Sequence, residues 1–322
     1  MSFHWGIMGA GNIASKFADA VRRLAGCEVI AVASRDGARA EEFVRQNGIP
    51  HACVGYETLL TEYRPDAVYI ATRTDSHAAL TELCIRHGVP VLCEKAMFTG
   101  SAQARRVLSL AREKGVFCME AMWSRFLPAV QEMKRRLDAG AIGDVLYAEL
   151  AIGWQAPSGP GNRFFDPAAG GGAAYDLTVY GYELADYFLG RPDDAVQCSV
   201  LWGGEGVDVT ENVTLTWSQR KPACMAALSA SIVTVLDERA VLHGSEGVLH
   251  MPKPHMAEGF TLRRFDGTVE EWRDGETVNG FVYEAAEVMR CVGAGLLESP
   301  TVPHDLTIRC AEMFDAINSA KG

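Results

Sequence analysis

The stretch from residue 3 to residue 35 constrains the fold of this 322-residue chain more than any other. An apolar run at 3–8 breaks into the sequence GAGNIA, after which apolar residues recur at helical spacing, and a second apolar run follows at 27–33. This order of strand, tight turn, helix and strand predicts a βαβ unit. A glycine fingerprint indicates a dinucleotide site only in this context.

The residues of the turn match the chemistry that such a site requires. Gly9 permits the tight turn, Gly11 lets the main chain approach a pyrophosphate, and Ala14 is the third small residue, which lets helix pack on strand. The anion would lie at the helix N-terminus, where free N–H groups and the helix dipole favour it. We expect Gly9, Gly11, Asn12 and Ile13 to bind the cofactor; a plain strand-to-helix turn is the alternative.

The end of the second strand indicates which dinucleotide binds. An NAD site usually has an acidic residue there, whereas this chain has Ser34 and Arg35, with Arg39 one helical turn further on. Because arginine presents a planar fork of donors that pairs with phosphate, these residues favour NADP over NAD. The alternative is that both arginines are solvated charges at the start of a helix. Asp36 is expected to cap the helix at 37–47.

The alternation of strands and helices continues to residue 120. Further strands are expected at 51–54, 66–71, 89–93 and 116–119, and helices at 37–47, from 56, at 78–87 and at 100–114. A polar loop at 72–77 and the pair Glu94-Lys95 follow two of these strands, at the edge where open α/β sheets bind ligands. We predict a doubly wound parallel sheet, a Rossmann domain of residues 1–120.

Residues 121–322 predict a second, substrate-binding domain of α+β type. Strands are expected at 145–154, 196–202, 209–217, 224–233, 239–242, 248–251, 260–265 and 269–272, and helices at 127–139, 173–189, 281–294 and 305–321. These runs indicate an open, mostly antiparallel sheet with helices on one face. The other, apolar face would need a partner, so we predict a homodimer through it. The Gly- and Pro-rich loop at 155–172 is expected to be ordered by a ligand or partner.

Composition limits the classes of function. A net charge of −11 and a pI near 5.3 argue against nucleic acid as a partner. The chain has neither a signal-peptide pattern nor a run of eighteen apolar residues, so we expect a cytoplasmic protein without membrane contact. Its nine cysteines include no Cys-x-x-Cys pair, which favours reduced thiols, and only Cys93 lies beside candidate chemistry. The spacing of His243, His250 and His255 fits no zinc pattern, and we expect no metal site.

Asp176 and Tyr180 are four residues apart in a predicted helix, and so share one of its faces. Neither side chain suits an apolar stripe, which makes the pair a candidate site. The alternative is that Tyr180 is a core aromatic residue and Asp176 a charge near the helix N-terminus.

Four segments together resemble the glucose-fructose oxidoreductase/inositol dehydrogenase family, also called Gfo/Idh/MocA. They are the GAGNIA turn, CEK at 93–95, EAMWSRF at 120–126, and GG at 171–172 with the following Asp176 and Tyr180. The resemblance covers essentially the whole chain. The chain is most similar to the branch of dimeric dihydrodiol dehydrogenases and NADP-dependent sugar dehydrogenases, partly because many other members carry His where Tyr180 stands.

The resemblance implies a hydride-transfer site between the two domains, at which Lys95 and Tyr180 meet the nicotinamide. Tyr180 would be the general base in carbinol oxidation and the general acid in the reverse direction, with Asp176 orienting the substrate or Lys95. Lowering a tyrosine pKa by about 2 to 3 units needs roughly 3 to 4 kcal/mol. One ammonium at about 4 Å supplies on the order of 4 kcal/mol at an effective dielectric near 20, so Lys95 suffices.

The resemblance also implies roles for other residues. Glu94, Thr72, His77 and Arg163 would contact the cofactor. Three aromatic residues would wall the substrate pocket, with ordinary core packing as the alternative: Trp123, Phe126 and Trp154.

Two residues depart from the family pattern. Ala96 follows Lys95 where the family usually has proline with a cis bond; because a non-proline cis bond costs about 3 kcal/mol, we predict a trans Lys95–Ala96 bond. Arg73 stands where a neutral residue is common, and would pair with substrate or face solvent. The sequence therefore predicts an NADP-dependent oxidoreductase acting on a sugar or vicinal diol, with a non-catalytic NADP-binding regulator as the alternative.

Overall fold

The computed structural model describes residues 2–157, 159 and 161–321. The chain divides into two compact units, which are described separately: a first unit of Met1–Trp123 and Asn279–Ala311, and a second unit of Ser124–Val278 and Glu312–Gly322. The predicted boundary at residue 120 lies close to the first division. Residues 279–311, which we had expected in the C-terminal domain, group with the first unit. The assignment of separate functions to 1–120 and 121–322 stays a prediction.

The first unit is built on a parallel sheet, the first sheet, which has six strands within the described residues, in the order β3-β2-β1-β4-β5-β6. Its strands are β1 (Phe3–Met8), β2 (Cys27–Ser34), β3 (His51–Val54), β4 (Ala67–Ile70), β5 (Val91–Glu94) and β6 (Cys118–Ala121). Strand order reverses between β1 and β4, where open α/β sheets hold their ligands. The predicted doubly wound Rossmann fold is confirmed.

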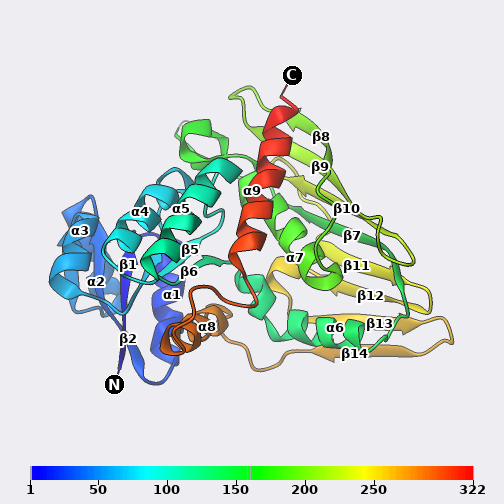
Figure 1. Cartoon of the computed structure of the whole chain (residues 1–322), viewed down its shortest axis with the longest axis horizontal. Coiled ribbons are helices and arrows are strands. Elements are labelled where there is room, and N and C mark those ends of the chain that lie inside the picture. The colour runs from blue at the N-terminus through cyan, green and yellow to red at the C-terminus, as the bar shows by residue number, and fades with distance from the viewer. Residues whose placement is uncertain (1, 158, 160, 322) are drawn as a thin grey trace. The chain divides into compact units, whose positions relative to one another are not determined.

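Helices connect and cover these strands (Figure 1). They are α1 (Asn12–Arg23), α2 (Gly37–Asn47), α3 (Tyr56–Thr58) with the π-helical turn Leu59–Tyr63, α4 (Thr74–Arg86) and α5 (Ser101–Lys114). α8 (Phe281–Gly293) packs on α1, and α9 (His304–Ser319) is divided between the two units at Ala311. The predicted loop at 72–77 is wrong in part, because α4 already begins at Thr74. Its polar residues occupy the first helical turn, where unpaired backbone N–H groups tolerate polar neighbours.

The second unit contains a second sheet, with eight strands among the described residues, in the order β14-β13-β12-β11-β7-β10-β9-β8. Its strands are β7 (Val145–Gly153), β8 (Gln197–Trp202), β9 (Asp208–Trp217), β10 (Cys224–Ser231), β11 (Arg239–Gly244), β12 (Gly247–Pro252), β13 (Gly259–Arg264) and β14 (Val269–Arg273). β7 is parallel to β10 and antiparallel to β11, and the other neighbours are antiparallel. The prediction of an open, mostly antiparallel sheet is confirmed.

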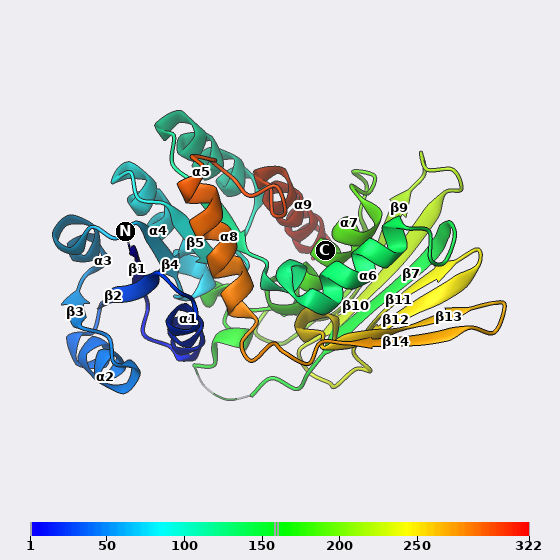
Figure 2. The same ribbon diagram turned by 90° about the horizontal axis from the view of Figure 1, so that it is seen from below.

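One face of the second sheet carries helices (Figure 2). α6 (Pro128–Asp138) packs on β13, and α7 (Val179–Leu189) packs on β7 and β10. A π-helical turn, Ala174–Thr178, leads directly into α7 and replaces the start of the regular helix that we expected at 173–189. The predicted loop at 155–172 is described except for Ser158 and Pro160, which lie outside the described residues.

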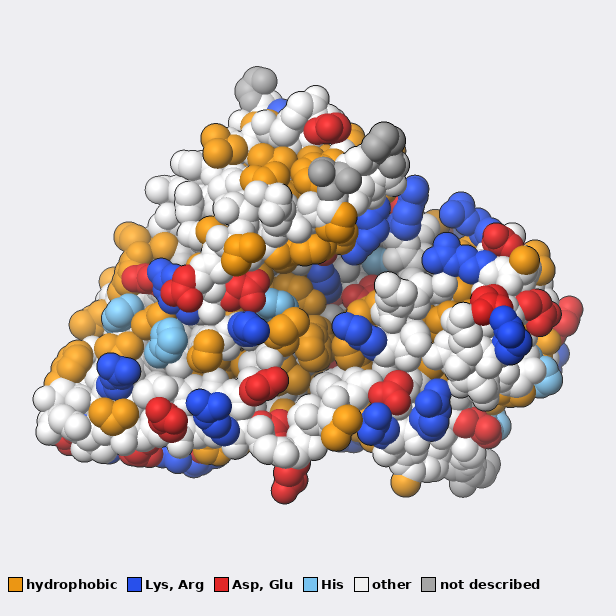
Figure 3. Space-filling view, turned by 180° about the vertical axis from the view of Figure 1, so that it is seen from behind, with side chains coloured by type: hydrophobic (Ala, Val, Ile, Leu, Met, Phe, Trp, Pro, Cys, Tyr) orange, Lys and Arg blue, Asp and Glu red, His pale blue; other side chains and the backbone are white. Residues whose placement is uncertain are grey.

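The opposite face of the second sheet is less apolar than we expected. Figure 3 shows hydrophobic, charged and histidine side chains interspersed on it. The ring of Tyr147 lies 6.0 Å from that of His243, Arg239 pairs with Glu149, and the Ser229 hydroxyl donates to a neighbouring asparagine. This face offers hydrogen bonds as well as apolar area to any partner. Among the described helices, none has the length and apolar character that crossing a membrane requires.

Candidate functional site

The N-terminus of α1 is open for an anion. Gly9 has a φ of +108°, and a Cβ added to it would lie 2.5 Å from the carbonyl oxygen of Ala71. In contrast, a Cβ on Gly11 would meet only Arg39 Nη2, at 3.9 Å. No side chain caps α1 and its first turn has no acidic residue, so its N–H groups and positive dipole end are available to a pyrophosphate. These residues fit a dinucleotide.

Cationic side chains flank this turn at the end of β2. Arg39 Nε donates a 2.9 Å hydrogen bond to the carbonyl of Ala10, which brings an exposed guanidinium to the glycine turn. Arg35 is exposed and makes no hydrogen bond or ion pair to the described residues. Ser34 is buried, and its hydroxyl oxygen accepts from the backbone N–H of Asp36. The Asp36 carboxylate caps α2 through the N–H of Arg39, as expected.

His77 connects the loops that follow β4 and β5. Its Nδ1 lies 2.9 Å from the carbonyl oxygen of Ala96, and its Nε2 lies 3.1 Å from that of Thr72. The side chain is 1% exposed, and burial lowers its pKa although the two carbonyls act in the opposite sense. Because both ring nitrogens face backbone groups, His77 is placed to hold the loops together. Its predicted contact with the cofactor, like that of Thr72, stays a prediction.

Glu94 and Lys95 end β5 at the ligand-binding edge of the first sheet. The Tyr69 hydroxyl donates to Glu94, and the backbone N–H of Lys95 donates to Glu94 Oε2 at 3.2 Å. The predicted trans bond is wrong, because the Lys95–Ala96 peptide is cis. That expectation considered only the intrinsic preference of the bond. It left out tertiary contacts such as that of the Ala96 carbonyl with His77.

In the second unit, Asp176 and Tyr180 lie at the start of the long helix. Asp176 is in the π-helical turn, where its Oδ2 accepts a 3.3 Å hydrogen bond from Trp154 Nε1. Tyr180 is the second residue of α7 and is 8% exposed, with its ring 5.4 Å from the ring of His255. The structure therefore pairs a carboxylate with an indole and a phenol with an imidazole, at positions four residues apart in the same helical segment.

The loop preceding this helix packs against the same residues. Phe164 meets Trp154 edge to face at 4.9 Å, and the Arg163 guanidinium lies 4.1 Å above the Phe164 ring. Gly171 fits closely beneath this loop, since a Cβ there would lie 2.5 Å from the Arg163 carbonyl oxygen. Trp154 and Arg163 thus lie near Asp176 in the second unit. The role of Arg163 toward the cofactor stays a prediction.

The other two predicted pocket aromatics have different surroundings. Trp123, in the first unit, stacks on Phe281 of α8 at 4.9 Å with an interplanar angle of 13°. Phe126 is 7% exposed, at the end of a short 3₁₀ helix. A place for either residue in the substrate pocket stays a prediction.

Sequence reasoning missed His255 and the buried charges of the helix region. His255 lies 75 positions beyond Tyr180 in the short helix Pro254–Met256, and no sequence pattern links the two residues. Arg125 Nε donates to Glu183 Oε2 at 2.7 Å, and its Nη2 lies 3.0 Å from Asp186 Oδ1. Burial raises the pKa of Glu183 to about 7 although Arg125 favours the ionised form. Arg125 lies within the segment EAMWSRF at 120–126, which resembles the family, so the sequence did contain a signal for this residue.

Sequence reasoning also missed a buried acid in the first unit. Glu284, on α8, is fully buried, and neither carboxyl oxygen has a hydrogen-bond partner among the described residues. Burial, followed by the charge of Glu94, raises its pKa well above the usual range. Glu284 is therefore held as a neutral acid close to the end of β5.

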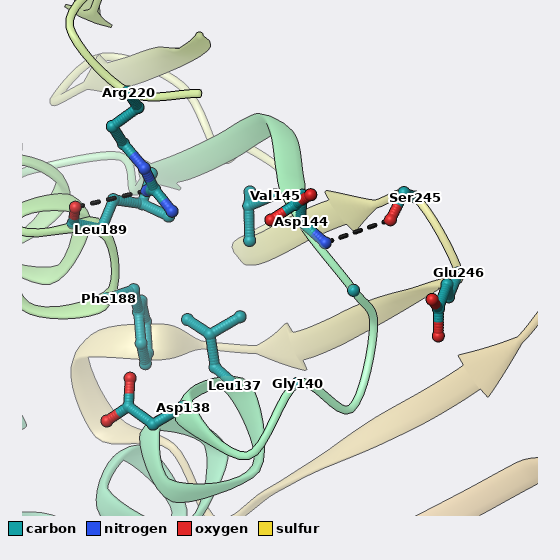
Figure 4. Close-up of a pocket in the computed structure, with 11 residues that line it drawn as sticks. Leu137, Asp138, Gly140, Asp144, Val145, Phe188, Leu189, Arg220, Ser245 and Glu246 are labelled. Carbon is teal, nitrogen blue, oxygen red and sulfur yellow. Dashed lines mark hydrogen bonds between the residues drawn. The ribbon is translucent and has the colours of Figure 1, made fainter. Parts of the chain in front are cut away.

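A separate hollow of about 400 Å³ lies at the far end of α7 (Figure 4). Phe188 and Leu189 line it, and Arg220 crosses it to donate to the Leu189 carbonyl. Eight residues of helix separate Tyr180 from Phe188, a rise of about 12 Å, so this hollow is distinct from the surroundings of Tyr180. In the described part of the chain, no three His, Cys, Asp or Glu side chains gather in a metal-binding arrangement.

Comparison with family models gives matches in both halves of the chain. The model described as an oxidoreductase family with an NAD-binding Rossmann fold matches residues 3–122. The GFO/IDH/MocA C-terminal domain matches residues 130–250.

Individual relatives match along the entire chain. Trans-1,2-dihydrobenzene-1,2-diol dehydrogenase of Mus musculus is 33% identical over 100% of this chain and 98% of that protein. Its counterpart in Sus scrofa is 31% identical with the same coverage.

Solved structures share the fold. KijD10, a 3-ketoreductase from Actinomadura kijaniata solved with NADP and TDP-benzene, has a TM-score of 0.87 at 26% identity, covering 99% of this chain and 98% of that one. Aldose-aldose oxidoreductase from Caulobacter crescentus, solved with glycerol, has a TM-score of 0.88 at 21% identity, covering 100% and 98%. The second likeness concerns the fold alone.

Proposed function

Because the chain belongs to the GFO/IDH/MocA family of NAD(P)-dependent oxidoreductases, we propose that it transfers hydride between NADP(H) and a carbinol of a vicinal diol or sugar. The observation that carries this proposal is the grouping of Asp176 and Tyr180 with Trp154 and His255, which supplies acid–base groups in an aromatic setting. The relatives named as dihydrobenzenediol dehydrogenases support the diol.

Tyr180 is the proposed general acid and base. In the oxidative direction its phenolate takes the hydroxyl proton of the substrate, and in the reductive direction its hydroxyl returns a proton to the carbonyl oxygen. The nicotinamide, when bound, accepts or supplies the hydride. Lys95 provides the positive charge that stabilises the phenolate, and Asp176 orients the substrate hydroxyl while Trp154 holds the carboxylate. Trp154, with Trp123 and Phe126, is proposed to contact the substrate.

NADP is the proposed form of the cofactor. The guanidinium of Arg39 is anchored at the glycine turn, Arg35 is exposed, and β2 ends in Ser34 where an NAD site usually carries an acid. A 2′-phosphate would find two donors there, whereas a ribose hydroxyl would find no acceptor of the usual kind. The NADP in the KijD10 structures supports this choice.

The test is a screen for NADPH formation from trans-1,2-dihydrobenzene-1,2-diol and from aldoses, using wild-type enzyme and the variants Tyr180→Phe and Lys95→Met. We expect turnover to fall by about 10²- to 10⁴-fold in each variant, the range for loss of a general acid–base group. Tyr187→Phe is a matched control on the same helix, because its ring still accepts the contact of Arg125. Unchanged activity in Tyr180→Phe would exclude the proposed chemistry.

The same screen tests the alternative of a non-catalytic regulator. Tight NADPH binding without turnover on any diol or aldose would favour the regulator. Turnover that depends on Tyr180 would exclude it. The direction favoured under cellular conditions depends on substrate and cofactor supply.

We also propose a homodimer through the uncovered face of the second sheet. Met225 is 45% exposed near the start of β10, opposite Tyr147 of β7, on a face whose polar pairs a second copy can complement. The molar mass from light scattering is expected to halve in Met225→Lys, while Val54→Lys, at an exposed apolar position in the first unit, should leave it unchanged. A wild-type monomer at micromolar concentration would contradict this proposal.

A further inference from the structure

A β-bulge in β9 places two acids on the same face of the second sheet. Leu201 of β8 pairs with Thr210, but the next residue, Trp202, pairs with Asp208, so one residue of β9 is extra. Residues three apart in a regular strand point to opposite faces, and one extra residue restores them to the same face. Asp208 and Glu211 are consequently both turned toward the helices, 2% and 1% exposed.

Asp208 holds the turn from which the long helix begins. Its Oδ2 accepts a 2.6 Å hydrogen bond from the backbone N–H of Ala174. Its Oδ1 lies against Gly172, where an added Cβ would be 2.2 Å from that oxygen and where φ is +122°. No other side chain caps this helix start among the described residues. The carboxylate therefore fixes both the turn and the first helical N–H.

Glu211 is the second buried acid on this face of the sheet. Its Oε2 accepts a hydrogen bond from the Thr178 hydroxyl at 3.1 Å, while Oε1 receives none from the described residues. Burial and then the neighbouring Asp208 raise the pKa of Glu211 well above its usual range, which favours the neutral form of this carboxyl beside Asp208. Cys198 of β8 and Tyr175 of the helix turn are the other titratable groups facing the pair.

We propose that Asp208 and Glu211 form a buried pair of acids that positions Asp176 and Tyr180. Asp208 fixes the backbone two residues before Asp176, and Glu211 binds the side chain two residues before Tyr180. The consequence for the reaction rests on the proposed function. Neither acid reaches substrate, so both are positioning residues. The pair also explains why Gly172 carries no side chain.

Ionisation of Glu211 would release the turn. When Glu211 ionises at alkaline pH, two carboxylates face each other in a buried site, and their repulsion moves Asp208 away from Ala174. Diol oxidation should then decline on the alkaline side, whereas ionisation of Tyr180 alone makes the oxidation rate rise with pH. Ionisation of Glu211 and ionisation of Tyr180 therefore change the oxidation rate in opposite directions, which distinguishes the two groups.

The test compares Glu211→Gln and Asp208→Asn with wild type. Amide hydrogen exchange is measured across residues 171–178 without substrate, together with NADPH binding and the pH profile of trans-1,2-dihydrobenzene-1,2-diol oxidation. Gln mimics a protonated acid, so Glu211→Gln should keep activity within twofold at pH 7 and lose the alkaline decline. Asp208→Asn should raise exchange at least fivefold and lower kcat at least tenfold, with NADPH affinity within twofold of wild type.

Asp193→Asn is the matched control, because Asp193 also accepts a backbone N–H, that of Ser218, at a different place in the second unit. Unchanged exchange in Asp208→Asn, or an alkaline decline retained in Glu211→Gln, overturns the inference and leaves the role of Tyr180 intact. If Tyr180→Phe stays active while exchange rises in Asp208→Asn, the positioning of the turn stands and the proposed chemistry fails.

Discussion

Two helices of this chain begin directly after glycine-rich turns, and their N-termini differ. In front of α1 the space at Gly11 is open, and neither a capping side chain nor an acid occupies it. In front of the long helix of the second unit, the carboxylate of Asp208 fills the corresponding space against Gly172. A glycine before a helix only permits another group to approach the backbone closely. If a buried acid of the chain lies there, it accepts from the N–H groups of the helix; if none does, an external anion can bind them.

The largest expected effect comes from placing an acid at the open terminus. In Asn12→Asp the new carboxylate faces the cofactor pyrophosphate, and two charges about 4 Å apart at an effective dielectric near 20 repel by roughly 4 kcal/mol. We expect NADPH affinity to fall by at least about 100-fold, as judged by fluorescence titration.

Ser101→Asp is the control for that variant, because α5 also begins after a glycine without a side-chain cap. Both variants should gain a similar, small increment of thermal stability from the helix dipole, and only Asn12→Asp should lose binding. Wild-type affinity in Asn12→Asp would show that the α1 terminus holds no phosphate.

Buried charge distinguishes the two helices further. The buried residues of α1 are apolar, whereas α7 buries Glu183 and Asp186 beside Arg125. Since burial raises the pKa of Glu183 from 4.5 to about 7, the folded protein binds this proton more tightly than the unfolded chain does. The free energy of unfolding should therefore fall by about 3 kcal/mol between pH 4.5 and pH 7 from this group alone.

Urea unfolding of wild type and Glu183→Gln at pH 5 and pH 8 measures this contribution. At pH 5 the variant should be close to wild type, because Gln mimics the protonated acid and Arg125 keeps its contact with Asp186, and its stability should change less with pH. Glu113→Gln, exposed near the end of α5, should keep the wild-type difference. An equal pH dependence in wild type and Glu183→Gln would contradict the assignment.

A smaller loss of NADPH affinity is expected when a side chain is added in the turn before α1. Gly11→Ala adds a Cβ without an internal clash, so the fold should be unaffected, but the cofactor would lose close approach. We expect NADPH affinity to fall by about 30-fold, corresponding to roughly 2 kcal/mol of overpacking. Gly172→Ala should do the opposite, lowering turnover through Asp208 while leaving NADPH affinity near wild type. Calorimetric titration of NADPH and initial rates would show whether Gly11→Ala mainly lowers affinity and Gly172→Ala mainly lowers turnover.

The smallest effect concerns the choice of cofactor at the same terminus. Arg39→Ala removes one charged donor to the 2′-phosphate, and we expect NADPH affinity to fall by about tenfold, or roughly 1.5 kcal/mol. NADH affinity should remain unchanged, so the preference shrinks. Arg45→Ala, on the same helix and paired with Glu42, is the matched control. Equal losses for both cofactors would indicate that Arg39 supports the turn and does not select phosphate.

Features set by neighbouring residues were predictable from the sequence. The bounds of α2 were correct because its cap, Asp36, and its terminating glycine, Gly48, are local signals. Features set by distant contacts were not predictable. Asp208 is 34 residues from the N–H it accepts, and the cis Lys95–Ala96 bond lies among contacts with His77. Local pattern fixes an element's type, and only the assembled sheet shows which side chains meet.

The parallel pairing of β7 with β10 has a consequence for how related enzymes diversify. After β7 the chain leaves the middle of the second sheet, passes through the loop at 155–172 and the helix with Tyr180, and re-enters the sheet at its edge strand β8, from which β9 and β10 follow. Insertions or deletions in the loop alter the surroundings of Asp176 without changing strand register. One scaffold can thereby accept new carbinols through changes in the length of a single connection.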